Sequence, residues 1–196
     1  SIWGYGETPY VDSESFDRAI VSNVYYWEEK LGIITFDGDV TEVKPEGWSY
    51  DDRCTKIILP ESVTKIGQKG FYKCTRLETF VAPGITEIGS ESFAECEKLT
   101  SFDWAKLTDI PYKAFYKAGF VDLVIPAQFK DITGAYAFRE CKNIKTLAFE
   151  EGVESISGSY VFTNSTAVES VKFPSTMKSI EEGAFYANYA LVSIEW

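Results

Sequence analysis

Apolar residues recur along the chain in a repeated phrase, in which an isoleucine is followed five or six residues later by a phenylalanine. Successive isoleucines are 22, 22, 22, 24 and 24 residues apart, and the phenylalanines keep step with them. A period of this length is typical of one short supersecondary unit per repeat, stacked into a solenoid. The two columns are Ile66, Ile88, Ile110, Ile132, Ile156 and Ile180, and Phe71, Phe93, Phe115, Phe138, Phe162 and Phe185.

Further columns appear when the repeats are aligned on the phenylalanine. Three residues on, every side chain is small, and a large apolar residue follows, one residue early in the repeat that contains Phe115. Two apolar residues then flank one variable position, as in Phe80 and Ala82 or Phe102 and Trp104, and a proline often follows. This alternation predicts a short half-buried strand that ends at the proline. The small column is Cys74, Cys96, Ala118, Cys141, Ser165 and Asn188, and the large column is Leu77, Leu99, Phe120, Ile144, Val168 and Leu191.

The remaining parts of the unit predict the rest of each coil. A second apolar pair, such as Val63 and Ile66, indicates another short extended segment, and residues 67–74 have room for one or two turns of helix. The sequence therefore predicts an α/β or mainly β solenoid with one short strand and a short helical turn per coil. Because stacked coils bring equivalent positions together, we expect the phenylalanines to form a continuous ladder.

The start of the chain departs from the repeat. Residues 31–60 fit a degenerate first coil with Trp48 at the phenylalanine position, so we assign residues 31–196 to about seven coils. Residues 1–30 do not fit, and their many aromatic side chains predict an N-terminal cap. The chain ends at Trp196 inside a strand pattern, so we expect either further coils or a partner chain beyond it. The aromatic residues of the expected cap are Trp3, Tyr5, Tyr10, Phe16, Tyr25, Tyr26 and Trp27.

Several runs resemble the BspA-type leucine-rich repeats of surface proteins from gut and oral anaerobic bacteria. The family phrase is matched by Leu59-Pro60, Val63-Thr64-Lys65-Ile66-Gly67, Gly70-Phe71 and Cys74-Thr75-Arg76-Leu77, and the resemblance extends over residues 20–196. Ile110-Pro111 and Ile156-Ser157 depart from it, because they lack the glycine. The resemblance implies an exported, cell-surface or secreted protein that binds host extracellular matrix proteins or another cell surface.

Composition limits the partners. The net charge is -11, from 19 Lys and Arg against 30 Asp and Glu, which argues against nucleic acid as a ligand because phosphate binding needs clustered cations. No apolar run is long enough to span a membrane. No signal peptide is present, and a chain that begins at Ser1 rather than Met is consistent with a leader or tag removed before residue 1.

The chain carries little that could support catalysis. It has no histidine, no Cys-x-x-Cys pair and no glycine-rich phosphate loop, so we expect neither an enzyme nor a cofactor or metal. Asp37-Gly38-Asp39 with Glu42 could be part of a calcium loop, although Asp-Gly also suits a plain turn between strands. Three of the four cysteines fall in the small column, where side chains point in parallel, so we expect buried, reduced thiols instead of disulfides.

The variable position between the paired apolar residues predicts the binding surface, because solenoids commonly bind partners on the strand face. Ile58, Val81 and Val124 are apolar where solvent exposure is expected, which suggests a contact patch, although strand propensity alone also selects such residues. We therefore predict a protein-binding and adhesion module. An inert spacer that displays another domain and a carbohydrate-binding module or enzyme are the alternatives. The candidate protein-binding residues are Ile58, Val81, Asp103, Val124 and Lys172.

Overall fold

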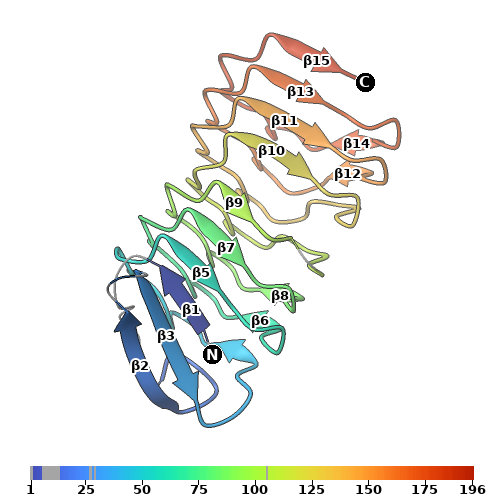
Figure 1. The fold of residues 1–196 in the computed structure, drawn as a ribbon. Coiled ribbons are helices and arrows are strands. Elements are labelled where there is room, and N and C mark those ends of the chain that lie inside the picture. Colours follow the sequence, from blue (N-terminus) through green and yellow to red (C-terminus); the bar gives the residue numbers. More distant parts are fainter. Residues whose placement is uncertain (1, 6–13, 27, 29, 105) are drawn as a thin grey trace.

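The fold was obtained as a computed structural model, and it describes residues 2–5, 14–26, 28, 30–104 and 106–196. The chain winds into a stack of about seven coils, and each coil adds one short strand to a main layer (Figure 1). The main-layer strands of the coils are β5 (Lys56–Ile58), β7 (Thr79–Val81), β9 (Ser101–Phe102), β10 (Asp122–Ile125), β11 (Thr146–Phe149), β13 (Ser170–Lys172) and β15 (Ser193–Glu195).

A second layer is built from the isoleucine segments. Its strands form two separate parallel sheets, one of three strands and one of two. In this layer Val43 pairs with Ile66 and Ile66 with Ile88, as the aligned columns predict. The strands are β4 (Glu42–Val43), β6 (Lys65–Ile66), β8 (Glu87–Ile88), β12 (Ser155–Ile156) and β14 (Ser179–Ile180).

The phenylalanine column forms the predicted ladder through the core. From Phe71 to Phe185, neighbouring rings are stacked with centroids 5.2 to 5.5 Å apart and interplanar angles of 4 to 12°. Trp48 continues the ladder, with its ring centroid 5.6 Å from that of Phe71 and an interplanar angle of 33°. Each ring fills the space that the coil above and the coil below leave open, so the coils support one another.

The segment around each phenylalanine is a run of tight turns, and the predicted helical turn is wrong in this detail. Within the described residues no helix is present. In every coil the second residue before the ring and the second residue after it have a left-handed backbone, as at Lys69 and Lys73, with φ of 56° and 58°. Such residues interrupt a right-handed helix. Their N–H groups bond the next coil instead, since Lys69 donates to the Ser90 carbonyl and Lys73 to the Ala94 carbonyl.

The N-terminal residues add an antiparallel group to the first coil (Figure 1). β1 (Ile2–Tyr5) lies between β3 (Leu31–Phe36) and β5 and is antiparallel to both, and β2 (Ile20–Tyr26) pairs with the other edge of β3. Phe16 is buried against Trp48, with ring centroids 5.8 Å apart. Tyr10 and Trp27 of the expected aromatic cap lie outside the described residues, and the boundary at residue 30 stays a prediction.

The Cys and Ser residues of the small column donate hydrogen bonds to the coil before their own. The Cys96 thiol donates to the Phe71 carbonyl at 3.1 Å, and the Cys141 thiol donates to the Phe115 carbonyl at 3.2 Å. The Ser165 hydroxyl makes the equivalent bond to Phe138, at 3.1 Å. All four cysteines are buried free thiols, and burial raises the pKa of Cys141 to about 12. The column therefore requires small side chains, and its Cys and Ser members also bond neighbouring coils, whereas Ala118 has no side-chain donor.

Candidate functional site

The strand face carries the five residues that sequence reasoning selected for binding. Ile58 pairs in register with Val81, and Val124 pairs through Ala148 with Lys172, so these positions form rows along the main layer. Val124 is 48% exposed and Lys172 is also exposed, whereas Ile58, Val81 and Asp103 are half-buried. The residues thus share a face, but they fall into two groups rather than one continuous patch.

The two groups are separated by a break in the main layer. β9 and β10 belong to different sheets, and Figure 1 shows them further apart than their neighbours. At most other junctions between coils, the residue before one strand donates its N–H to the matching carbonyl of the preceding coil; Thr100, for example, donates to Glu78 at 3.0 Å. No such bond joins Val121 to Thr100, and the described backbone has no hydrogen bond between β9 and β10.

Bulky side chains and a shortened link account for the break. Trp104 stands in a column where the next coil has Ile125, and its ring contacts Phe115 and Phe120 at centroid distances of 5.4 and 6.0 Å. Strands must come within about 4.8 Å to pair, and an indole packed between two coils holds them apart. The link after Ala118 is one residue shorter than in the other repeats, which shifts the start of β10 relative to β9.

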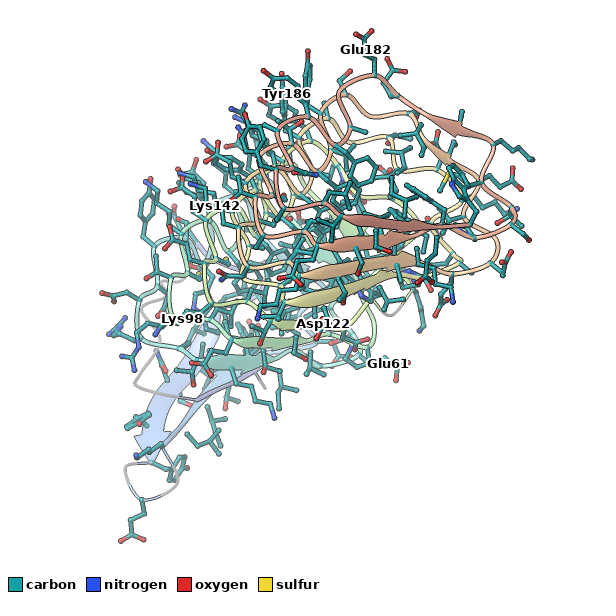
Figure 2. All side chains as sticks on the ribbon, turned by 90° about the horizontal axis from the view of Figure 1, so that it is seen from above. Glu61, Lys98, Asp122, Lys142, Glu182 and Tyr186 are labelled. Carbon is teal, nitrogen blue, oxygen red and sulfur yellow. The ribbon has the colours of Figure 1, made fainter. Side chains whose placement is uncertain are left out.

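A cleft of about 350 Å³ lies over the break and opens on the strand face. Its floor is apolar, with Phe102, Trp104, Phe120 and Leu123. Asp122 and Glu150 supply charge at its rim, and none of the described residues that line it is a cation. Val124 borders the same cleft, so one of the predicted binding residues lies beside the break in the main layer. Figure 2 shows Asp122 on the side of the strand arrows.

A smaller hollow lies on the opposite, turn edge of the solenoid, where Figure 2 shows Tyr186. It has a volume of about 180 Å³ and is lined by Tyr136, Arg139, Tyr160, Thr163, Asn164 and Tyr186. The rings of Tyr136 and Tyr160 are stacked 5.7 Å apart at 6°, and the Arg139 guanidinium lies 5.2 Å from the centre of the Tyr136 ring. We call this hollow the tyrosine pocket.

Gly183 makes room for the tyrosine pocket. Its backbone is left-handed, with φ of 79°, and an added Cβ would come within 2.6 Å of the Tyr160 ring. The Thr163 hydroxyl donates to the Gly183 carbonyl at 2.7 Å, which holds the same turn against the ring. The exposed fractions of Tyr160 and Tyr186 are 42% and 66%. Aromatic edges and polar groups are therefore presented together at this position.

The turn that was considered as part of a calcium loop is occupied by an arginine. Arg18 donates from Nε to the Asp39 carbonyl at 3.1 Å and lies beside Gly38. Asp17, next to it, accepts hydrogen bonds from Thr41 and Glu42; burial raises the pKa of Asp17, but these bonds outweigh it and lower the pKa overall. Among the described residues, no group of three or more Cys, Asp or Glu is placed to hold a metal ion.

Sequence reasoning missed both the cleft and the tyrosine pocket as sites. The short link after Ala118 and the unusual Trp104 were visible in the aligned columns, and either could have indicated an irregular junction. The tyrosines gave no such signal, because Tyr136 and Tyr160 precede the phenylalanine whereas Tyr186 follows it. Only the winding of the coils brings these three positions to one place.

The geometry defines a leucine-rich-repeat solenoid, and comparison with known proteins identifies the family. The sequence profile of the BspA type leucine rich repeat region matches six copies, over residues 18–135 and 108–196. The chain therefore belongs to the BspA-type leucine-rich repeat family. A search of curated proteins finds no significant match.

Solved structures of bacterial repeat proteins share the fold. A leucine-rich repeat protein from Bacteroides ovatus is 23% identical with a TM-score of 0.71, and the match covers 89% of this chain and 44% of that protein. The T. pallidum leucine rich repeat protein is 24% identical with a TM-score of 0.69, and the match covers 95% of this chain and 91% of that protein. At such identities the likeness establishes the fold alone. In the described part of the chain, no helix is long and apolar enough to cross a membrane.

Proposed function

We propose that this chain is a non-enzymatic binding module, displayed on a cell surface or secreted, that contacts a protein partner through its strand face. Repeat proteins of this family are binding or structural modules, and their extended faces suit macromolecular partners. The observation that carries the proposal is the cleft between β9 and β10, with the exposed Val124 at its border. Ile58, Val81, Asp103 and Lys172 extend the contact to both sides of the cleft.

The cleft has the composition expected at the centre of an interface. Buried interface cores are rich in aromatic side chains, and binding energy concentrates where such groups exclude water. Phe102 and Trp104 supply the aromatic floor, and Asp122 and Glu150 supply a polar rim. A host extracellular matrix protein or a protein of another cell surface is the partner that the family resemblance favours.

Substitutions on the strand face test this function. Purified extracellular matrix and mucosal proteins are immobilised, and binding of the chain is measured by surface plasmon resonance. For each protein that binds, Val81→Arg, Asp103→Lys and Val124→Arg should each weaken the affinity by about tenfold or more, which corresponds to about 1.4 kcal/mol.

Thr75→Arg is the matched control, because Thr75 is an exposed residue of a turn, away from the strand face. It should leave the affinity unchanged. If all four variants bind every partner as the native chain does, the strand face is not the binding site. If no protein of the panel binds at all, the inert spacer is the better description.

A carbohydrate is the second candidate ligand, and the tyrosine pocket favours it. Tyrosine rings beside guanidinium, hydroxyl and amide groups can combine apolar contact with hydrogen bonds to sugar hydroxyls. Arg139 and Asn164 are the side chains that we expect to donate those bonds. A glycan array probed with the native chain and with Tyr160→Ala tests this function. Hits that disappear in the variant support it, and an array without hits removes it.

A further inference from the structure

The break between β9 and β10 leaves backbone groups without the partners that they have at the other junctions. In parallel strands the N–H and C=O of alternate residues point to the same neighbour. Asp103 donates its N–H to Phe80 in β7, so the backbone of Phe102 points to the other side, toward β10. The Val121 and Ile125 carbonyls accept bonds from the coil of β11, so the backbone groups of Asp122 and Val124 point toward β9.

These groups form an open strand edge inside the molecule. Within the described residues, no ladder bond joins Phe102 to Asp122 or Val124 across the break. An open strand edge is a template for pairing, and partners often complete it by adding an extended segment. Here the edge borders a cleft of about 350 Å³ in place of a neighbouring strand.

The residues that line the cleft determine which side chains such a segment can carry. Successive side chains of an extended peptide point to opposite sides, so one set can face the floor while the other faces the rim. The floor of Phe102, Trp104 and Phe120 suits apolar side chains. The rim carries Asp122 and Glu150, and the described lining includes no cation, so the rim suits Lys or Arg.

We propose that the cleft binds an extended segment of a partner protein in which cationic and apolar residues alternate, and that the segment pairs with the backbone of Asp122 and Val124. This proposal rests on the proposed function and specifies the partner's chemistry. The main-chain bonds supply affinity, and the acidic rim supplies the preference for cations. A neutral oligosaccharide stacked on Trp104 would be a different ligand for the same cleft, and it gives different results below.

Three synthetic peptides test the proposal on the full chain. The first is the acetylated and amidated heptapeptide Lys-Val-Lys-Val-Lys-Val-Lys, the second has Glu in place of Lys, and the third is the Lys peptide N-methylated along one edge. Affinities are measured by fluorescence anisotropy at low salt. We expect the Lys peptide to bind, the Glu peptide to bind at least about tenfold more weakly, and the N-methylated peptide to lose at least about tenfold because it cannot donate along one edge.

The variant Asp122→Asn with Glu150→Gln removes the rim charge and keeps its hydrogen bonds, since Asp122 accepts from Thr146 and Glu150 accepts from the Ala127 N–H. This variant should bind the Lys peptide with an affinity about tenfold lower than that of the native chain. Asp52→Asn with Glu182→Gln, at two exposed acidic residues outside the cleft lining, is the control that should bind normally. In hydrogen exchange, the amides of Asp122 and Val124 should exchange fast in the free chain and slow down with the peptide.

The proposal is overturned if the Lys and Glu peptides bind equally, if N-methylation has no effect, or if no peptide binds. Binding of neutral oligosaccharides that slows exchange at Val124 would also overturn it and would make the cleft a sugar site. If only the peptide-binding proposal fails and the strand face still binds proteins, Val81→Arg would still weaken binding of partner proteins, whereas Asp122→Asn with Glu150→Gln would not.

Discussion

The same pair of neighbouring coils is hydrogen-bonded at the turn edge of the solenoid but not on its strand face. Where the coil of Phe93 meets the coil of Phe115, the turn edge is intact: Glu91, Phe93 and Glu95 donate to the next coil at 2.9, 2.9 and 2.7 Å. The two phenylalanine rings remain stacked at 5.5 Å. On the strand face, no ladder bond joins the described residues of the same two coils, and a cleft lies between β9 and β10.

This difference shows that the two sides of a coil are held by separable interactions. The phenylalanine ladder and the turn bonds set the stacking of the coils, and the strand ladder adds to it where geometry allows. A bulky Trp104 and a short link therefore open the strand face without dividing the solenoid. An opening of this kind leaves a cleft in the strand face.

Truncation of a phenylalanine in the ladder should cause the largest loss in the free energy of unfolding. Phe115 is fully buried and contacts Phe93, Phe138 and Trp104, so Phe115→Ala removes both transfer free energy and packing around it. We expect a loss of about 3–5 kcal/mol in the free energy of unfolding. Urea denaturation measures it, with Lys98→Ala as an exposed control. Equal stability of the two variants would contradict the ladder as the main support.

Proline substitutions in β10 and β11 should differ in their effect on stability. Ala148 lies in β11, whose ladders to β10 and β13 are complete, and Val124 lies at the equivalent position beside the break. Proline removes an N–H that is bonded at Ala148 and open at Val124. Ala148→Pro should therefore be the more destabilising by about 1–3 kcal/mol. Thermal and urea unfolding measure the difference, and equal losses would mean that β10 is paired on both sides.

The small column should respond to the loss or gain of one donor. Cys141→Ala leaves the Phe115 carbonyl without its thiol donor and should cost about 1 kcal/mol, whereas Cys141→Ser should cost less because Ser165 makes the same bond. Ala118 has no donor to offer the Phe93 carbonyl, so Ala118→Ser should be neutral or stabilising. Urea denaturation of the three variants checks the order.

The same thiols should not react with a thiol reagent in the native protein. The raised pKa and burial of Cys141 suppress its thiolate, so a thiol reagent at pH 8 should react with none of the four cysteines before unfolding and with all four in denaturant. Fewer than four reactive thiols in denaturant would reveal a disulfide.

The smallest effect is expected at a left-handed turn residue. Glu91 has φ of 58°, a conformation that glycine adopts without a steric cost. Glu91→Gly should therefore raise the free energy of unfolding by a few tenths of a kcal/mol, because relief of strain slightly exceeds the added entropy of the unfolded chain. The control is Glu97→Gly at an exposed residue of ordinary φ, which should lose stability. A loss in both variants would mean that the turn imposes no strain.

Particular residues show which features of the fold could be predicted from the sequence. The spacing of Phe71 through Phe185 was sufficient to predict the ladder, because equivalent positions in stacked coils must meet. Placing Val124 on the strand face was equally direct, since alternation about Leu123 and Ile125 leaves one side chain outward. The helical turn was wrong, because left-handed residues such as Lys69 carry no sequence signal when they are not glycine.

The sequence by itself determined the period, the core columns and the strand positions of this protein, because these depend on the local order of apolar and polar residues. Only the tertiary structure decided where the strand layer opens and which tyrosines meet at the turn edge. The opening depends on how the Trp104 ring packs against Phe115, Phe120 and Phe129, which follow it in the chain. The tyrosine pocket depends on the stacking of coils that brings Tyr136, Tyr160 and Tyr186 together, although these residues are 24 and 26 positions apart in the chain.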